Sequence, residues 1–312
     1  MKVVESPAFT LGMLAPKYWC IWLSFGLLAI LVNIVPYRVL IKIGYGLGSI
    51  AQCVLKRRAK VAYRNFELSF PELKESEVSQ LVKDTFRKTG LAVIETGMAW
   101  FWPDWRVKRH VHIQGQMELL AQEYAQRGVL VVCGHFLNLE MTARIFGLFA
   151  PGYGVYRAHS NPVYEFIQHR GRTRKGHKMI DRSDIKSMIR VLKTGKRLWY
   201  LPDHDYGAKS SVFVPFFGVE QAATTSGTGF LIDMSGCAVM SGVSIRKGRH
   251  YHLEISEDIS SQFSRKEPVL AAKIMNQEIE RMIEKDVSSW MWLHKRFKTR
   301  PEHSKGACYY SC

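Results

Sequence analysis

The longest uninterrupted apolar pattern lies near the start of the chain. Positions 18–37 are uncharged and rich in aromatic and branched aliphatic side chains. As one helix this segment would reach about 30 Å, the thickness of a bilayer core. It therefore predicts a membrane anchor within residues 1–40. The anchor either crosses the bilayer or, because Asn33 and Pro36 weaken its far end, lies partly in the membrane interface.

A helical pattern follows at residues 72–102. Apolar side chains recur there at spacings of three and four, as at Val78, Val82 and Phe86, which is typical of an amphipathic helix. Before it, glycines stand at 44, 46 and 48. No strand, turn and helix surround them as in a dinucleotide loop, so we interpret them as small residues for close helix packing.

After residue 105, short apolar runs alternate with helical segments. The runs that we interpret as strands occupy residues 129–133, 153–156, 197–201, 237–244 and 250–255. Strands that alternate with helices indicate an α/β domain, in which helices cover a mostly buried sheet. The chain is thus predicted to contain an anchor, residues 1–40, and an α/β catalytic domain, residues 41–312.

The formal net charge of +17 indicates an acidic partner, which could be nucleic acid, anionic lipid, a phosphorylated substrate or an acidic carrier protein. A basic series at 38–64 suits the anionic cytoplasmic leaflet, although a solvated helix face is the alternative. A second basic cluster, at 170–178, is either a solvated loop or a landing site for phosphates or an acidic carrier. It lacks the interleaved aromatic residues of base stacking, so no nucleic-acid partner is predicted.

The six cysteines are scattered through the chain, without a C-x-x-C pair. This arrangement favours reduced thiols in a cytoplasmic setting over a disulfide framework. Cys133 lies in an apolar run and is predicted to be a core thiol, not a nucleophile.

His135 and Glu140 place a possible base and a carboxylate in one short segment. On a continuous helix, side chains five positions apart diverge by about 140°, so the two can meet only if His135 precedes the helix. The apolar run at 129–133, Gly134 and a helical pattern starting near Asn138 permit this. Glu140 could then hold one imidazole nitrogen while the other accepts a proton. A capped loop histidine and an ordinary first-turn glutamate are the alternative interpretation.

Further polar residues follow two other predicted strands. Arg157 comes after the strand at 153–156, and Asp203 and Asp205 come after the strand at 197–201. Ligands of open α/β sheets gather beyond the carboxyl ends of the strands, so these loops should converge on His135. Arg157 could bind a phosphate or an oxyanion, and the aspartates could position a sugar or His135 itself. A surface cation and an Asx turn are the alternatives, and no metal site is predicted.

Several motifs, taken together, match those of one family. They occupy residues 56–60, 95–103, 135–140, 154–157, 199–207, 211–215, 220–225 and 292–301. On these motifs the chain resembles, from about residue 18 to 301, the late acyltransferases of lipid A biosynthesis, the lauroyl transferase branch in particular.

The resemblance implies a sheet like that of glycerolipid acyltransferases, covered by helices and preceded by a membrane helix. The implied activity moves a fatty acyl chain, lauroyl or similar, from acyl carrier protein to a hydroxyl of a phosphorylated Kdo2-lipid IVA-type precursor. The implied location is the Gram-negative inner membrane, single-pass or monotopic among its lipids, with the active site on the cytoplasmic side. No cofactor or metal is implied.

The resemblance also assigns site residues. His135 matches the histidine of the family's H-x4-D/E motif, and Glu140 matches its acidic partner. Arg157, Asp203 and Asp205 match further motif positions as substrate-binding residues. His204 stands where the family often has Gln. Gly134 in place of the superfamily's Asn, and the missing Phe-Pro-Glu-Gly motif, disfavour glycerol phosphate as acceptor.

These residues suggest a mechanism in which His135 removes the proton of a bound hydroxyl while Glu140 orients the imidazole. Arg157 or a backbone amide would face the oxyanion or a substrate phosphate. A thioester donor is already activated, so no acyl-enzyme is required. Two alternatives remain open, a phospholipid acyltransferase and a non-catalytic membrane protein that binds anionic lipid.

Overall fold

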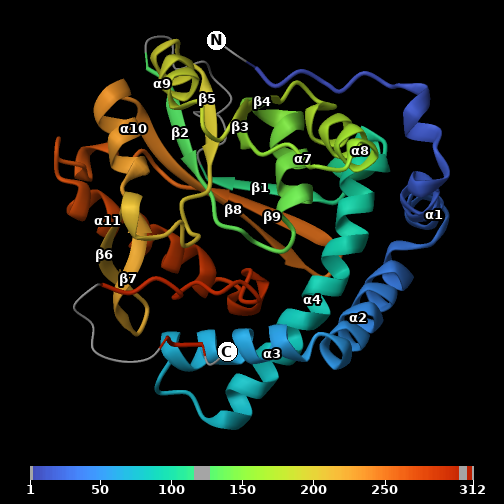
Figure 1. The fold of residues 1–312 in the computed structure, drawn as a ribbon, viewed down its shortest axis with the longest axis horizontal. Helices are drawn as coiled ribbons and strands as arrows, with labels where there is room; N and C mark the ends of the chain where they lie inside the picture. The colour runs from blue at the N-terminus through green and yellow to red at the C-terminus, as the bar shows by residue number, and fades with distance from the viewer. Residues whose placement is uncertain (1–2, 116–126, 302–307, 311–312) are drawn as a thin grey trace.

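A seven-stranded sheet lies at the centre of the computed structural model, which describes residues 3–115, 127–301 and 308–310 (Figure 1). The strand order is β1-β9-β8-β2-β5-β3-β4, and neighbours are parallel except for the antiparallel β8–β9 hairpin. The strands are β1 (Val111–Gly115), β2 (Val129–Val132), β3 (Tyr153–Tyr156), β4 (Lys178–Asp181), β5 (Arg197–Tyr200), β8 (Ala238–Lys247) and β9 (His250–Ile255). The predicted α/β class is confirmed.

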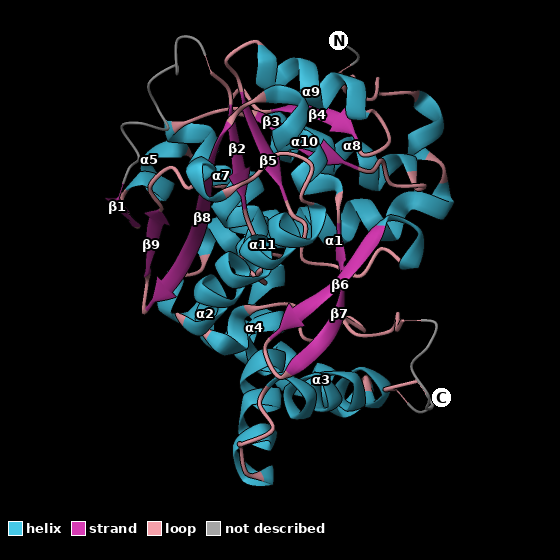
Figure 2. Ribbon diagram, turned by 90° about the vertical axis from the view of Figure 1, so that its left-hand side faces the viewer, coloured by secondary structure: helices cyan, strands magenta, loops and turns pink. Residues whose placement is uncertain are grey.

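The five predicted strands are confirmed. The sequence did not predict β1 and β4 of the main sheet, and the position of these two strands explains why. Central β2 is buried at every residue, which produces the apolar run visible in the sequence. β1 and β4 form the two edges of the sheet and mix polar with apolar residues. The antiparallel hairpin of β6 (Ser211–Phe216) and β7 (Val219–Thr225) stands apart from the main sheet (Figure 2).

Helices cover both faces of the sheet because side chains of successive strand residues point to opposite faces. On one face, Leu130 and Val132 pack with residues of three helices, α9 (Ile185–Lys193), α10 (Gly227–Ser235) and α11 (Pro268–Glu284). On the other face, Val129 and Val131 pack with α4 (Glu75–Phe101) and α7 (Leu139–Phe149). The remaining helices of this body are α5 (Asp104–Lys108) and α8 (Pro162–Thr173), together with the 3-10 turns η3 (Ala208–Ser210), η4 (Ser260–Gln262) and η5 (Val287–Ser289).

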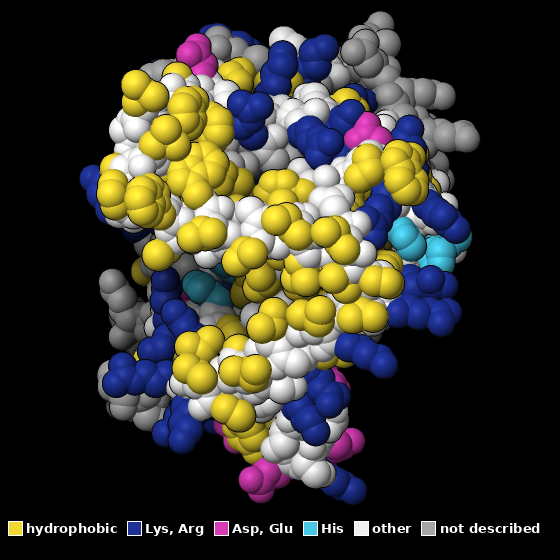
Figure 3. All heavy atoms as spheres, turned by 90° about the vertical axis from the view of Figure 1, so that its right-hand side faces the viewer, with side chains coloured by type: hydrophobic (Ala, Val, Ile, Leu, Met, Phe, Trp, Pro, Cys, Tyr) yellow, Lys and Arg dark blue, Asp and Glu magenta, His cyan; other side chains and the backbone are white. Residues whose placement is uncertain are grey.

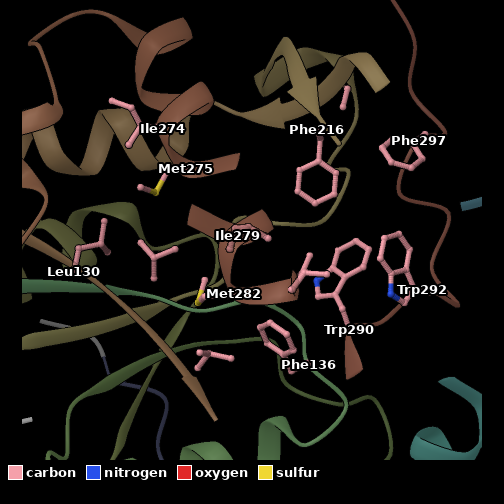
Figure 4. Packing of buried hydrophobic residues seen from close by; sticks show 14 of the residues in the cluster. Leu130, Phe136, Phe216, Ile274, Met275, Ile279, Met282, Trp290, Trp292 and Phe297 are labelled. Atoms are coloured by element: carbon pink, nitrogen blue, oxygen red, sulfur yellow. The ribbon is translucent and has the colours of Figure 1, made fainter. Parts of the chain in front are cut away.

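An aromatic cluster holds the C-terminal segment against this core. Trp290 and Trp292 have ring centroids 4.7 Å apart, and Phe216 of β6 lies 5.8 Å from Trp290 and 6.2 Å from Phe297. Figure 4 shows these rings side by side, next to Phe136. Residues 290–301 thus have fixed places although they form little regular structure.

The N-terminal helices pack along α4. They are α1 (Trp19–Ile34), α2 (Tyr37–Val54) and α3 (Lys56–Ser69), all of which contact α4, and α2 runs beside α4 in Figure 1. The short 3-10 turns η1 (Leu11–Leu14) and η2 (Pro16–Tyr18) precede α1. A Cβ on Gly90 of α4 would lie 2.1 Å from the backbone nitrogen of Gly48 and 2.2 Å from the carbonyl oxygen of Gly44. The prediction of close helix packing through glycine is confirmed at these two positions of α2. The predicted boundary at residue 40 falls inside α2.

An apolar band covers the outer side of the N-terminal helices. Residues Pro16–Ile34 form a helix long and apolar enough to cross a membrane, which confirms the predicted apolar N-terminal helix. Figure 3 shows hydrophobic side chains gathered over this side of the molecule. The exposed large side chains of the band are Leu11, Leu14, Trp19, Leu23, Leu27, Ile30, Ile34, Val39, Leu47, Ile50, Val54, Leu55 and Val93.

Candidate active site

His135 lies just beyond the carboxyl end of β2, and its partner comes from the neighbouring strand β5. Its Nδ1 lies 2.6 Å from Oδ1 of Asp203, and its backbone N–H donates to Oδ2 over 2.7 Å. The indole Nε1 of Trp290 donates to the same Oδ2 over 2.6 Å. Three hydrogen bonds therefore fix a carboxylate whose side chain has no exposed surface.

These bonds decide the charge of Asp203 and the tautomer of His135. Burial alone would raise the pKa of the Asp203 carboxyl, but the charge and hydrogen bonds of His135 outweigh it, so this pKa lies well below its ordinary value. An ionised carboxylate only accepts hydrogen bonds, so Nδ1 of His135 is the donor. Nε2 makes no hydrogen bond within the described residues and remains available to accept a proton.

The predicted bond between His135 and Glu140 is wrong. Glu140, in the first turn of α7, accepts hydrogen bonds from Arg172 Nε over 3.0 and 3.1 Å, and from Trp100 Nε1 over 3.0 Å. Arg172 Nη2 also binds it. From its place on α7, Glu140 faces α8 and α4, whereas His135 faces the end of β5. Asp203 thus occupies the position that sequence reasoning gave to Glu140.

A stack of imidazole rings lies behind His135. The ring of His204 is nearly parallel to that of His135, with centroids 3.5 Å apart, and His294 lies on its other side at 4.3 Å. Burial lowers the pKa of His204 to about 3, so this ring is neutral at physiological pH. In the sequence, His204 was noted as a departure from the family pattern and as part of a possible metal site that was not favoured.

A cleft of about 400 Å³ opens beside Nε2 of His135. Its apolar wall comes from α7 and the parallel strands, and the cations Arg157, Arg172 and Arg182 line it too. The apolar lining residues are Leu139, Ala143, Phe146, Val155, Met179, Trp199 and Leu201. An acyl chain suits the apolar wall, and phosphate groups suit the arginines.

The structure brings some of the predicted residues to this cleft and leaves one outside. His135, Glu140 and Arg157 line it, and Asp203 lies directly behind His135. The carboxylate of Asp205 instead accepts from the backbone N–H and the hydroxyl of Thr299, both over 2.8 Å. Asp205 therefore holds the C-terminal segment, and it is not among the residues that line the cleft.

Cys133 lies on the cleft wall as a buried thiol, as predicted. Burial raises the pKa of this thiol to about 12, so it is a poor nucleophile at neutral pH. The five described cysteines, which do not include Cys312, are unpaired.

Sequence reasoning missed Trp290, Arg172 and Arg182 as parts of the site. Arg172 lies in the basic cluster at 170–178, which was the available signal. Trp290 gave no signal, because its contact with Asp203 joins positions 87 apart in the chain.

A histidine held by a buried carboxylate, beside an apolar cleft lined by arginines, has the groups that an enzyme needs to activate a hydroxyl and to hold an acyl chain, and this chemistry suits an acyltransferase. The apolar N-terminal helix and the apolar outer band are consistent with association with a membrane.

Comparison with known proteins gives the family. The sequence pattern described as bacterial lipid A biosynthesis acyltransferase matches residues 6–299, so the chain belongs to this family. It is 46% identical to the lipid A biosynthesis lauroyltransferase of Escherichia coli (strain K12), over 95% of this chain and 97% of that protein. It is 41% identical to a lipid A biosynthesis acyltransferase of Haemophilus influenzae, over 99% of this chain and 100% of that protein. It is 40% identical to the lipid A biosynthesis palmitoleoyltransferase of Escherichia coli (strain K12), over 94% of this chain and 95% of that protein. The protein is an O-acyltransferase, and the resemblance seen in the sequence is confirmed.

Proposed function

We propose that this protein transfers a fatty acyl chain, lauroyl or similar, from acyl carrier protein to a hydroxyl of a Kdo2-lipid IVA-type precursor. The pairing of His135 with Asp203 at an apolar cleft is the observation that carries this proposal. The similarity to proteins named lauroyltransferase and palmitoleoyltransferase supports the choice of acceptor and of a fatty acyl donor.

In the proposed reaction, Nε2 of His135 takes the proton as the acceptor hydroxyl attacks the thioester carbonyl. A C–O bond forms, the C–S bond breaks, and the proton passes from the imidazolium to the leaving thiolate. Asp203 fixes the tautomer of His135 and stabilises the imidazolium, as the carboxylate of a catalytic triad does. The thioester is already activated, so the step needs no covalent acyl-enzyme.

The cations of the cleft have proposed roles in binding. Arg157, which is exposed, faces a substrate phosphate or the developing oxyanion. Glu140 acts through Arg172, because their ion pair sets the shape of the wall where α7 meets α8. Asp205 acts by holding residue 299, which keeps the loop after β5 in place.

The apolar band would place the cleft at the membrane. In Figure 3 a histidine lies in a hollow at one edge of the band. We propose that residues 1–40 anchor the protein in the Gram-negative inner membrane, single-pass or monotopic, and that residues 41–312 act on its cytoplasmic side. The basic start of α3 suits the anionic lipids of that leaflet.

Mass spectrometry of lipid A tests this function. Cells that lack the protein should contain lipid A with one acyl chain fewer, and the wild-type gene should restore the mass. A gene carrying His135→Ala should fail to restore it although the protein is present in the membrane fraction. Unchanged lipid A in the deletion strain, with acylation of a lysophospholipid by the purified protein, would favour a phospholipid acyltransferase instead.

A further inference from the structure

A second hollow lies where the end of α5, the β8–β9 turn and the start of α2 meet. Its volume is about 390 Å³, and it shares no lining residue with the active-site cleft. It is lined by Tyr37, Trp105, Arg106, Arg109, His110, Arg249 and His250. Three guanidinium groups and two imidazoles thus face one cavity, and no carboxylate is among its described lining residues.

Among the residues that the structure describes, no carboxylate forms an ion pair with the arginines of this hollow. Arg109 and Arg249 are exposed, and neither forms an ion pair with a described residue. Burial, together with the neighbouring positive groups, lowers the pKa of His110. Guanidinium groups bind phosphate in a bidentate manner, so the chemistry of the hollow fits a phosphate group.

The hollow adjoins the apolar band. Arg106 donates to the carbonyl oxygen of Asn33, near the end of α1, over 3.0 Å, and its guanidinium lies 4.2 Å from the ring centroid of Trp102. Trp105 is 65% exposed, as aromatic residues at the lipid headgroup level often are. In Figure 3, His side chains and Lys or Arg side chains gather at one edge of the band.

We propose that this hollow binds the phosphate headgroup of an anionic membrane phospholipid whose acyl chains lie along the apolar band. The headgroup would meet Arg106, Arg109 and Arg249, while Trp105 sits at the interface. An acidic protein is less suitable as the occupant, because the adjoining surface is apolar and the carrier would have to compete with lipid there. The inference goes beyond the acyl transfer proposed above and does not rest on it.

The test is vesicle flotation of the full-length protein carrying Arg109→Gln and Arg249→Gln. The loss of two surface cations should weaken binding to phosphatidylcholine vesicles that contain phosphatidylglycerol by about tenfold to thirtyfold. Binding to pure phosphatidylcholine vesicles should not change, since the apolar band supports it. The matched control carries Arg190→Gln and Lys273→Gln, which remove the same charge from exposed positions of α9 and α11, on the opposite face of the sheet. The control variant should lose less than about threefold in affinity for the vesicles that contain phosphatidylglycerol.

Two outcomes would overturn the proposal. Equal losses in the test and control variants would show a diffuse charge effect without a site. Unchanged vesicle binding, with a raised KM for the acyl carrier protein donor, would show that the arginines dock the carrier. Thermal unfolding of both variants checks that the fold is intact. Flotation involves no acyl transfer, so its result is independent of whether the proposed reaction is correct.

Discussion

The pairing of His135 with Asp203 joins residues 68 positions apart, and the ordering of the active site depends on it. The carboxylate has a single side-chain geometry because Trp290 and the backbone of residue 135 also bind it. At the scale of the residue, the site therefore contains two separate acidic groups with different partners. Asp203 binds His135, and Glu140 binds Arg172.

This division predicts different effects for two isosteric substitutions. Asp203→Asn should lower kcat by about 10²- to 10⁴-fold, because an amide no longer imposes the tautomer or stabilises the imidazolium. Glu140→Gln should lower kcat by less than about tenfold, since Glu140 does not touch His135. Steady-state kinetics with an acyl carrier protein donor measures both. A larger kcat loss for Glu140→Gln than for Asp203→Asn would contradict the assignment.

His204 predicts a pH dependence of stability. Its pKa in the folded protein is about 3, below that of free histidine. The unfolded chain therefore takes up a proton first on acidification, so this contribution to stability is complete above about pH 6.5 and is lost as the pH falls towards 3. Between pH 7 and pH 5 the wild type should lose about 1–2 kcal/mol more free energy of unfolding than His204→Gln. Urea unfolding in detergent at the two pH values measures this, and equal losses would disprove it.

At the scale of the element, the sequence was informative where burial is complete. β2, β5 and β8 are apolar runs because they lie inside the sheet, and they were predicted. β1 and β4 were not, because edge strands are half exposed and carry no such run. The prediction that His135 contacts Glu140 was wrong for a related reason. Helical spacing describes neighbours within one helix, whereas the partner of His135 is Asp203 at the end of the adjacent strand β5. The sequence offered this contact only as one of two roles for Asp203 and Asp205, because it does not show which strands are neighbours in the sheet.

The crossing of α2 and α4 gives a prediction with a control in the same helix. A Cβ on Gly48 would lie 2.1 Å from the carbonyl oxygen of Phe86, so Gly48→Ala should destabilise the fold by about 1–3 kcal/mol or more. Gly46→Ala has nothing within 4 Å of its new Cβ and should be neutral or stabilise α2 by about 0.5–1 kcal/mol. Thermal unfolding in detergent compares the two. Equal effects would mean that the helices are not in backbone contact.

At the scale of the whole molecule, the apolar band lies on the outer side of helices that pack against α4. α1 packs on α4 through one face, with Leu28 against Gly97, and leaves its other face exposed. The sequence predicted an apolar N-terminal segment, but only the fold shows that exposed apolar residues of several helices form one band.

The exposed residues of the apolar band are predicted to hold the protein in the membrane. Leu23 and Leu27 are 62% and 63% exposed on α1, and replacing both by Glu should move the protein out of the membrane fraction, since a charge costs about 3 kcal/mol in an inserted helix. Phe230→Glu with Met234→Glu alters two exposed apolar residues of α10, outside the band, and should leave the protein in the membrane fraction. Sedimentation of cell membranes followed by immunoblotting measures the distribution. A similar shift for both pairs would contradict a membrane role specific to the band.

The most direct test of the proposed mechanism is the rate at which purified His135→Ala transfers an acyl chain from acyl carrier protein to the lipid A precursor. If His135 is the base, kcat falls by at least about 10²-fold, while vesicle binding matches the wild type and the variant, although less stable because Asp203 loses a partner, is folded at the assay temperature. A variant that transfers the chain at the wild-type rate would show that His135 is not the base.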